Sequence, residues 1–399
     1  MRTFGRPWPW SPVIPLLLLT LCLLLPRSAQ ATGEGQNGFP NWAERVLLEW
    51  TNRARADPQY EMARCGTNCS DAACYQPQPP LTYRLELNRS ARFHSDELAQ
   101  QGYFAHDSAC TLVSNIDALY PASCNGAASC ACVGGVKQCS PQCTTTGQRI
   151  ALFGGNFTGE NIASPTDPDR AFYLWLYEPY DKTFCTFDLG PPTNGHRWNL
   201  LTNGPGLGAG VSGPAVTDFG SASPPAKIPS GAHYPRQANQ IEVWANWYDP
   251  RGAPTVASVN INGGCFPLTR ERGSGTNGAW STMIGGAGTG CYRYYFVFRD
   301  VDNNVITYPT TGSLGIGPAG SCADWDTTRP PYDTSCDRTV PDAGTSGGTD
   351  GGTGGGGPGG CGCHLGGAAS ATDERAAVLL LGLGLGLGLW ARRKRIEHG

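Results

Sequence analysis

Four short fragments of the chain each carry one side chain able to bind a divalent cation or to transfer a proton near neutral pH. Together they hold two histidines and two glutamates, while the whole chain has only six histidines. The fragments are Ala105-His106-Asp107, Gly159-Glu160-Asn161, Trp175-Leu176-Tyr177-Glu178 and Gly195-His196-Arg197. Because they lie far apart in the sequence, the fold must bring them together, and we expect one cleft to hold all four groups.

A helix is predicted over residues 41–56, ahead of the first fragment. Asn41 is a favourable N-cap, and Glu44 three residues later completes a capping box. The pair Asp57-Pro58 ends the helix, because the residue before a proline is biased away from helical geometry. Apolar residues at helical spacing predict that one face is core: Trp42, Val46, Leu47, Trp50 and Ala54.

A second helix, over residues 88–101, leads to the first histidine of the set. Gly102 is a natural terminator for it. One face is apolar apart from a single histidine, and consists of Leu87, Ala91, His94 and Leu98. We therefore interpret His94 as a core histidine with a local hydrogen bond. His106 lies four residues past the end of the helix, where a loop can direct its ring into a cleft.

A third helix is predicted to begin with Asp167 as its N-cap and Pro168 at the first helical position. Ala171, Trp175 and Glu178 then share one face, so we expect the carboxylate to point where the tryptophan points. A proline follows Glu178 and stops the helix, and the aromatic neighbours favour partial burial of this acid.

The order of these features resembles the CAP superfamily, which includes cysteine-rich secretory proteins, antigen 5 and plant pathogenesis-related proteins. The resemblance runs from about Asn41 to Phe219, where Asp218-Phe219-Gly220 is expected to end a strand. It depends on several motifs in order: Pro80-Leu81, Tyr103-Phe104-Ala105-His106, Gly159-Glu160-Asn161-Ile162-Ala163, Trp175-x-x-Glu178 and Gly195-His196-Arg197-Trp198-Asn199-Leu200-Leu201.

This resemblance implies an α-β-α sandwich with a central antiparallel sheet over residues 39–220. It also implies that His106, Glu160, Glu178 and His196 line one cleft. The chain departs from simple members in a long cysteine-containing loop between His106 and Glu160, and in an insertion over residues 180–194. Both segments could lie over the cleft and change access to it.

After residue 220 the pattern changes to the two-residue alternation of β-strands. Alternating apolar residues predict a strand from Ile241 to Trp247, and Tyr292 to Phe298 forms another. We expect a small immunoglobulin- or fibronectin-like β-sandwich over residues 228–318, with Cys265 and Cys291 joined across neighbouring strands. The predicted fold class is therefore α+β, with a CAP domain followed by this sandwich.

The two ends of the chain carry signals for export and anchoring. Residues 1–31 combine a basic start, an apolar run and a small-x-small cleavage site, as a signal peptide does. Residues 319–360 are predicted to be a linker, with cysteines first and a glycine-rich stretch after them. Residues 361–399 hold Cys361-Gly362-Cys363, a short apolar stretch and an arginine cluster, which predict a short transmembrane helix with the body outside.

This tail resembles the sorting tails of myxobacterial surface proteins. The resemblance implies processing or lipid attachment at Cys361 and Cys363, and a protein that reaches the cell surface or outer membrane or is released from it. A permanent single-pass anchor is the alternative.

The chain has 17 cysteines. Without Cys22 of the signal peptide and the pair at 361 and 363, an even number remains, which in an exported protein favours disulfides over metal sites. The densest group has no zinc-binding spacing and predicts a cross-linked loop: Cys110, Cys124, Cys130, Cys132, Cys139 and Cys143.

Composition and site chemistry together indicate a function. A net charge of −3 with 15% charged residues shows no basic stripe for nucleic acid. Neutral imidazoles bind zinc or similar divalent cations, so His106 and His196 are candidate metal ligands, with a glutamate as third ligand or orienting group. The leading hypothesis is a surface-tethered, non-enzymatic binding module for a lipid, small molecule or protein.

Two alternatives remain open. In the first, the protein is a metal-assisted extracellular protease or esterase with Glu160 or Glu178 as general base, although the chain has no familiar hydrolase motif. In the second, the four groups form a buried polar network, each histidine paired with a glutamate, and serve only to stabilise a structural surface domain.

Overall fold

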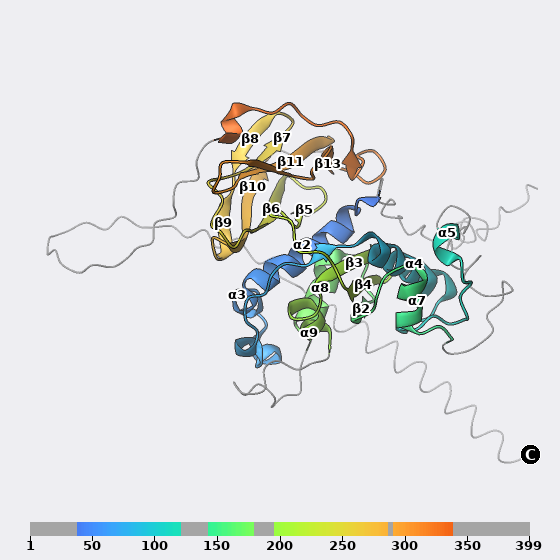
Figure 1. The fold of residues 1–399 in the computed structure, drawn as a ribbon. Helices are drawn as coiled ribbons and strands as arrows, with labels where there is room; N and C mark the ends of the chain where they lie inside the picture. Colours follow the sequence, from blue (N-terminus) through green and yellow to red (C-terminus); the bar gives the residue numbers. More distant parts are fainter. Residues whose placement is uncertain (1–37, 121–142, 179–194, 286–289, 338–399) are drawn as a thin grey trace, which may run out of the picture. The chain divides into compact units, whose positions relative to one another are not determined.

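The structure is a computed structural model that describes residues 38–120, 143–178, 195–285 and 290–337, which all fall in one compact unit of the chain. Helices and three β-sheets occur together in it, so the α+β class is confirmed (Figure 1). The predicted signal peptide, most of the cysteine loop, the insertion over residues 180–194 and the tail over residues 361–399 lie outside the described residues. Within the described ranges, no helix is long and apolar enough to cross a bilayer.

The first sheet contains four strands in the order β1-β3-β4-β2. These are β1 (Thr82–Tyr83), β3 (Gly206–Val211), β4 (Ala215–Gly220) and β2 (Gly159–Ala163). The pairs β3–β4 and β2–β4 are antiparallel, whereas β1 runs parallel to β3. The sheet is therefore antiparallel except at the two-residue edge strand, and the predicted strand end at Gly220 is confirmed.

Helices cover both faces of this sheet (Figure 1). On one face lies α4 (Leu85–Gln101), whose backbone approaches β3 so closely that Cβ atoms on Gly208 and Gly210 would lie 2.0 Å and 2.3 Å from the nearest helix nitrogens. Leu207, Ala209 and Val211 alternate with these glycines and pack on the opposite face. That face contacts α2 (Trp42–Ala56), α8 (Pro168–Leu176) and α9 (His196–Leu201).

The predicted helix ends agree with the structure in most details. The capping box of Asn41 and Glu44 is present at the start of α2. Helix α4 begins three residues earlier than predicted and ends at Gly102, which has a φ of 68°. Asp167 caps α8 through a hydrogen bond from the Arg170 amide. The remaining helices are short: α3 (Pro58–Met62), η2 (Gly66–Cys69), η3 (Ala72–Cys74), α5 (Ile116–Leu119), α7 (Thr146–Leu152) and η5 (Thr334–Asp337).

His94 is a core residue, as its position on α4 predicts. Its side chain is fully buried. The Nδ1 atom lies 3.1 Å from Glu97 Oε2, and the Nε2 atom lies 2.9 Å from the carbonyl oxygen of Ala105. Both ring nitrogens are therefore engaged within the protein, which leaves neither for a ligand.

The second half of the described chain consists of two further sheets. One has the order β5-β6-β10-β9, and the other has the order β14-β13-β11-β7-β8 with β12 paired to β11. Their strands are β5 (Gly231–Tyr234), β6 (Gln240–Tyr248), β7 (Val256–Ile261), β8 (Gly264–Pro267), β9 (Thr269–Gly273), β10 (Asn277–Gly285), β11 (Tyr292–Arg299), β12 (Val305–Tyr308), β13 (Ser313–Ile316) and β14 (Trp325–Asp326).

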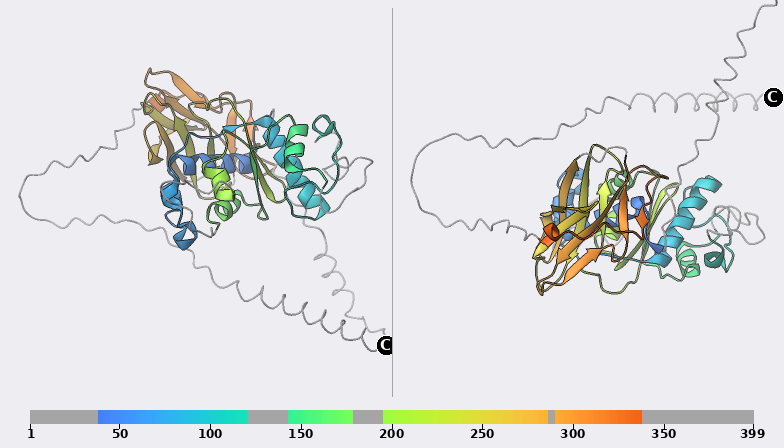
Figure 2. Two further views of the ribbon diagram at one scale, coloured as in Figure 1. Left: turned by 60° about the horizontal axis from the view of Figure 1, so that its bottom comes forward. Right: turned by 90° about the horizontal axis from the view of Figure 1, so that it is seen from above.

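Strand β6 is buried on both faces. Ile241, Val243, Ala245 and Trp247 belong to the core cluster shared by the two sheets, as the alternation in the sequence predicts. Trp244 points the other way, into the core cluster that contains α2. Helix α2 thus lies between the first sheet and the β5-β6-β10-β9 sheet, an arrangement that can be followed in Figure 2. The immunoglobulin- or fibronectin-like identity of the second half stays a prediction.

The predicted disulfide between Cys265 and Cys291 is wrong. Cys265 pairs with Cys336, and Cys291 pairs with Cys322, with Cα–Cα distances of 5.1 Å and 5.2 Å. Strand β7 lies between β8, which carries Cys265, and β11, which begins beside Cys291. Two strand spacings of about 4.8 Å each exceed the usual Cα separation of a disulfide.

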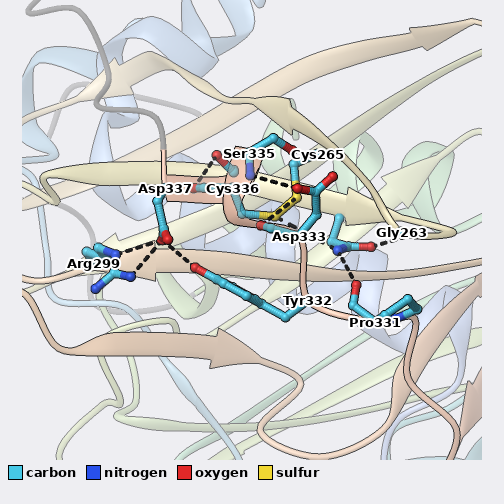
Figure 3. The surroundings of a disulfide bond; sticks show 11 residues. Gly263, Cys265, Arg299, Pro331, Tyr332, Asp333, Ser335, Cys336 and Asp337 are labelled. Atoms are coloured by element: carbon cyan, nitrogen blue, oxygen red, sulfur yellow. Dashed lines mark hydrogen bonds and ion pairs between the residues drawn. A yellow bond between two sulfur atoms is a disulfide. The ribbon is translucent and has the colours of Figure 1, made fainter.

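These two disulfides tie the chain after residue 318 to the β-sheets. In Figure 3, Cys336 of η5 joins Cys265, and the neighbouring Asp337 accepts hydrogen bonds from Arg299 and Tyr332. The short strand β14 also pairs with β13. Elsewhere, Cys65 is joined to Cys69, and Cys110 and Cys143 are both disulfide-bonded, which confirms the prediction of disulfides.

Peptide mapping under non-reducing conditions tests the two pairings. We expect one linked peptide pair that contains Cys265 and Cys336 and another that contains Cys291 and Cys322, because the strand order holds these cysteines at bonding distance. Mass spectrometry before and after reduction identifies them. A linked peptide with Cys265 and Cys291 would contradict the strand order.

A buried ion pair between α2 and α4 provides a test of the packing. Glu44 and Arg92 have almost no exposed side-chain surface. Glu44→Ala should therefore lower the free energy of unfolding by about 3–5 kcal/mol, because it leaves a buried guanidinium unpaired. Urea denaturation measures the change. The matched control is Glu86→Ala, which removes the partly exposed Arg84–Glu86 pair and should cost under about 1 kcal/mol. Equal losses would contradict the burial of Glu44.

Candidate functional site

His106 and Glu160 form the first of two histidine–glutamate pairs. His106 lies in the loop after α4, and Glu160 lies on β2. The distance from His106 Nδ1 to Glu160 Oε1 is 2.8 Å. Because a carboxylate only accepts hydrogen bonds, Nδ1 is the donor, and the Nε2 atom of the neutral ring keeps its lone pair. The imidazole is 51% exposed whereas the carboxylate is 1% exposed. A buried carboxylate therefore holds a ring that remains accessible to solvent.

Helix α7 holds this pair in place. Arg149 of α7 is fully buried, donates to Glu160 Oε2, and also donates from Nη1 to the carbonyl oxygen of His106 at 2.9 Å. The Thr146 hydroxyl donates to the same carbonyl at 2.9 Å. The His106 loop is therefore fixed through its backbone as well as its ring.

Glu178 and His196 form the second pair. Glu178 follows α8, and His196 is the first residue of α9. Glu178 Oε2 lies 3.1 Å from His196 Nδ1 and accepts a hydrogen bond from the His196 amide at 3.2 Å. Both side chains are half-buried. By the same argument as for His106, Nδ1 donates and Nε2 is left for another partner.

Arg197 fixes the chain on which Glu178 lies. Its Nε atom donates to the carbonyl oxygen of Leu176 at 2.7 Å, and its Nη2 atom donates to the carbonyl oxygen of Glu178. The guanidinium is fully buried and pairs with Asp71 at 2.6 Å. The end of α8 and the start of α9 are thus joined by one cation.

Two asparagines link the pairs to each other. Asn161, next to Glu160 on β2, donates to the carbonyl oxygen of His196 at 3.2 Å. Asn199 of α9 donates to the carbonyl oxygen of Glu160 at 3.2 Å and to Asn161 Oδ1 at 2.8 Å. The four predicted residues are therefore arranged as two neighbouring pairs. Among the described residues, no group of three or more His, Cys, Asp or Glu side chains is close enough to hold a metal ion.

Glu160 is ionised despite its burial. Burial disfavours the carboxylate, but the charge of Arg149, then the charge of His94 and the hydrogen bond with His106, outweigh it and lower the pKa of Glu160 to about 2. The pKa of Asp218, the cross-strand neighbour of Glu160 on β4, is shifted in the opposite direction. Burial and then the charge of Glu160 raise the pKa of Asp218 well above its usual value. The two acids of this buried pair are therefore shifted in opposite directions, and Asp218 is the one whose protonated form is favoured.

The pKa values of His106 and Glu178 also respond to their partners. The hydrogen bond with Glu160 raises the pKa of His106 above its ordinary value, against the effect of burial. Burial acts to raise the pKa of Glu178, but the hydrogen bond with His196 and the charge of that ring outweigh it and lower the pKa. Both glutamates therefore act as anions that orient an imidazole.

Glu178 lies past the end of its helix, so helical spacing does not fix the direction of its side chain. Helical spacing placed it on the same face as Trp175, which is buried and donates from Nε1 to the carbonyl oxygen of Ile162 at 3.0 Å. Helix α8 ends at Leu176, so the helical direction no longer applies two residues later. Glu178 points to His196 instead. The expected partial burial of this acid is confirmed.

Sequence reasoning missed three residues that position the site. Arg149 and Asp218 come from separate elements, and no local pattern connects either of them to Glu160. Asn199 lies in the motif after His196, so its place in that motif is a signal that was present in the sequence.

Comparison with known proteins found little. No protein-family model matches the chain, and no curated protein matches it. Among solved structures, one similar chain is an extracellular protein containing an SCP domain from Bacillus anthracis str. Ames, with 20% identity and a TM-score of 0.25. The match covers 45% of this chain and 40% of that one, which is less than two thirds of its length. This likeness is too slight to support an inference about fold or activity.

The first pair predicts a pH dependence that NMR can measure. The pKa of His106 should lie above 6.5 and should fall towards that value in Glu160→Gln, which removes the charge. The stabilisation from charged His106 is fully present below its unfolded pKa and is lost as the pH rises through its folded pKa. The stabilisation from ionised Glu160 is present above pH 4.5 and is lost as the pH falls towards about 2.

His233 is the internal reference for this titration. Burial, and then the charge of Arg45, lower the pKa of His233 well below its usual value. Its ring signals should therefore stay constant from pH 6 to pH 8 (about the usual range for histidine titration) in both proteins. A His106 pKa that does not change in Glu160→Gln would contradict the pairing.

Proposed function

We propose that this chain is an exported module of the CAP type, which binds a partner outside the cell without catalysing a reaction. The observation that carries this proposal is the arrangement of the two histidine–glutamate pairs. In each, a carboxylate holds the ring through Nδ1 and leaves Nε2 for a ligand that comes from outside. Carboxylate–histidine pairs of this kind orient and strengthen imidazole ligands of metals.

A divalent cation such as zinc would take the Nε2 atoms of His106 and His196 as ligands. The donor chemistry fits, because neutral imidazoles suit zinc and each ring is hydrogen-bonded through Nδ1 to a carboxylate. Glu160 has one oxygen on His106 and the other on Arg149, so it serves as an orienting group rather than as a third ligand. When bound, the cation supplies a positive charge and open coordination positions for a ligand group.

The charges of the glutamates argue against the hydrolase alternative. A general base works best when its pKa lies near the working pH. The pKa of Glu160 is lowered to about 2, and that of Glu178 is also lowered. Both oxygens of Glu160 are already engaged. These observations favour binding over catalysis.

A purely structural role is the second candidate, and one observation favours it. Glu160 and Arg149 are buried together, and their hydrogen bonds join β2, α7 and the His106 loop. Removing such a partner leaves a buried charge unpaired, which is costly whether or not the site binds anything. A test of function must therefore use the exposed histidine rings and leave Glu160 unchanged.

The partner belongs to one of three classes in this proposal: a small molecule, a lipid or a protein. Phe104, two residues before His106 in the sequence, is exposed and offers an apolar contact to a partner. Attachment to the cell surface through the tail over residues 361–399 is also part of the proposal, and it depends on the sequence of that tail.

Calorimetric titration of the full chain with zinc tests the site. We expect saturable binding at neutral pH, and a loss of affinity below about pH 6 as the imidazoles take up protons. The double variant His106→Ala with His196→Ala should abolish the binding. Unchanged titration in that variant would refute the assignment of the two histidines as ligands.

Thermal melting with and without chelator separates the two candidates. Under the binding proposal, chelator lowers the melting temperature of the unmodified chain and has no further effect on the double variant. Under the structural candidate, Glu178→Ala lowers the melting temperature equally with and without chelator. Turnover of a peptide or ester panel by the unmodified chain, lost in the double histidine variant, would instead support the hydrolase.

A further inference from the structure

A cavity of about 540 Å³ lies in a part of the described structure that uses none of the four histidine and glutamate residues. Its walls come from α2, α3 and α8 on one side and from β6 and β9 on the other. We call it the α2–β6 cavity, and define it by Trp50, Tyr60, Glu61, Asp169, Trp244 and Arg272. A volume of this size is in the range of small-molecule sites.

Aromatic rings form much of the wall of the α2–β6 cavity. Trp50 and Trp244 meet edge to face with their ring centroids 4.7 Å apart. The ring centroids of Tyr173 and Tyr177 lie 5.0 Å apart on the α8 side of the cavity. Tyr60 is 54% exposed although it is a large ring. Trp50 and Trp244 are themselves buried, and the Arg53 guanidinium lies over their rings at 4.1 Å and 5.2 Å. The contact area for a ligand therefore comes from the more exposed tyrosine rings, at low cost in conformational entropy.

Fixed polar groups lie between the rings. The Trp50 indole donates to Asp169 Oδ1 at 2.7 Å, and the Trp244 indole donates to Glu271 Oε2 at 2.8 Å. These bonds hold the rings and the carboxylates in defined positions. Glu271 also accepts a hydrogen bond from Arg272 on its other oxygen. A carboxylate has about four lone-pair sites, so the single accepted bond at Asp169 leaves more room there for hydroxyl donors of a ligand.

The strongest charge in the cavity is compensated within the protein. Glu61 accepts two hydrogen bonds from Arg53 at 3.1 Å and 3.2 Å, one from Arg272, and one from the Tyr173 hydroxyl at 2.6 Å. Glu61 is therefore not an isolated anion in the α2–β6 cavity. The Nε atom of Arg272 is buried and has no partner among the described residues, so one N–H donor remains.

A second hollow of about 460 Å³ adjoins the first, because Tyr234 lines both. The Tyr234 ring stacks on Trp42 with centroids 6.1 Å apart and planes 11° apart. Arg236 lies over the Trp42 ring at 5.5 Å, and its Nε and Nη1 atoms are buried without a partner among the described residues. Each of the two hollows thus contains aromatic rings and a buried arginine N–H donor. Two such hollows side by side suit a ligand made of several similar chemical units.

The lining excludes other classes of ligand. Its aliphatic side chains are alanines and prolines only, which gives an acyl chain little to pack against. Four carboxylates and three arginines line the α2–β6 cavity, so its net charge does not favour an anion such as a nucleic-acid backbone: Glu61, Asp169, Glu242, Glu271, Arg53, Arg64 and Arg272. Stacked rings with donors and acceptors between them match the alternating flat faces and hydroxyl edges of a sugar.

We propose that the α2–β6 cavity and the adjoining hollow form one groove that binds a neutral oligosaccharide. The tyrosine rings Tyr60, Tyr173 and Tyr177 stack on the sugar faces, and Asp169, Arg272 and Arg236 take the hydroxyl groups. This inference goes beyond the proposed function, and it stands whether or not the histidine pairs bind metal.

Titration of the full chain with cellotetraose, maltotetraose and chitotetraose tests the proposal by calorimetry and by tryptophan fluorescence. At least one of these sugars should bind saturably and change the emission, because Trp42, Trp50 and Trp244 line the groove. Tyr60→Ala should weaken binding by about tenfold, and Asp169→Asn should weaken it as well. The matched control is Tyr332→Ala, which removes a 45% exposed tyrosine outside both hollows and should change nothing.

Three outcomes would overturn the proposal. The first is no binding of any of the three sugars by the unmodified chain. The second is an equal loss of binding in Tyr60→Ala and Tyr332→Ala, which would place the contact elsewhere. The third is binding of neutral tetrapeptides in a Tyr60-dependent way with no binding of sugars, which would make the groove a peptide site.

Discussion

Helix α2 has to be buried along its whole length although it carries charged side chains. It lies between the first sheet and the β5-β6-β10-β9 sheet, so water reaches neither its apolar nor its polar face. A buried charge without a partner is far more costly than a lost surface contact. Each polar group of the helix therefore needs a partner from another element: Glu44 has Arg92, Asn52 has the backbone of Leu81, and Arg53 has Glu61.

This requirement joins the two halves of the described chain. Glu49 of α2 accepts a hydrogen bond from Asn246 on β6, and burial raises the pKa of Glu49 to about 7. Glu61 just after α2 binds Arg272 from β9. Glu61 and Arg272 both line the α2–β6 cavity, so the ion pair between α3 and β9 is also part of its wall. Stability and the shape of the groove thus depend on the same side chains.

The two histidine–glutamate pairs differ in how deeply the glutamate is buried and in which arginine positions it. Glu160 is buried on a strand and held by Arg149, so its charge is fixed and its ring partner is presented at the surface. Glu178 is half-buried at a helix end and is positioned through its backbone by Arg197. The asparagines between them, Asn161 and Asn199, connect the pairs through backbone carbonyls rather than through charges.

Local features were determined by the sequence alone. The capping box at Asn41, the turn at Gly102 and the alternation on β6 arise from contacts between residues a few positions apart, which any fold containing these segments satisfies. Pairings across long separations were decided by the tertiary structure. The disulfide partner of Cys265 follows from strand order, and the partner of Glu61 lies 211 residues away on β9. Such contacts depend on how all layers pack at once, and no spacing in the sequence encodes them.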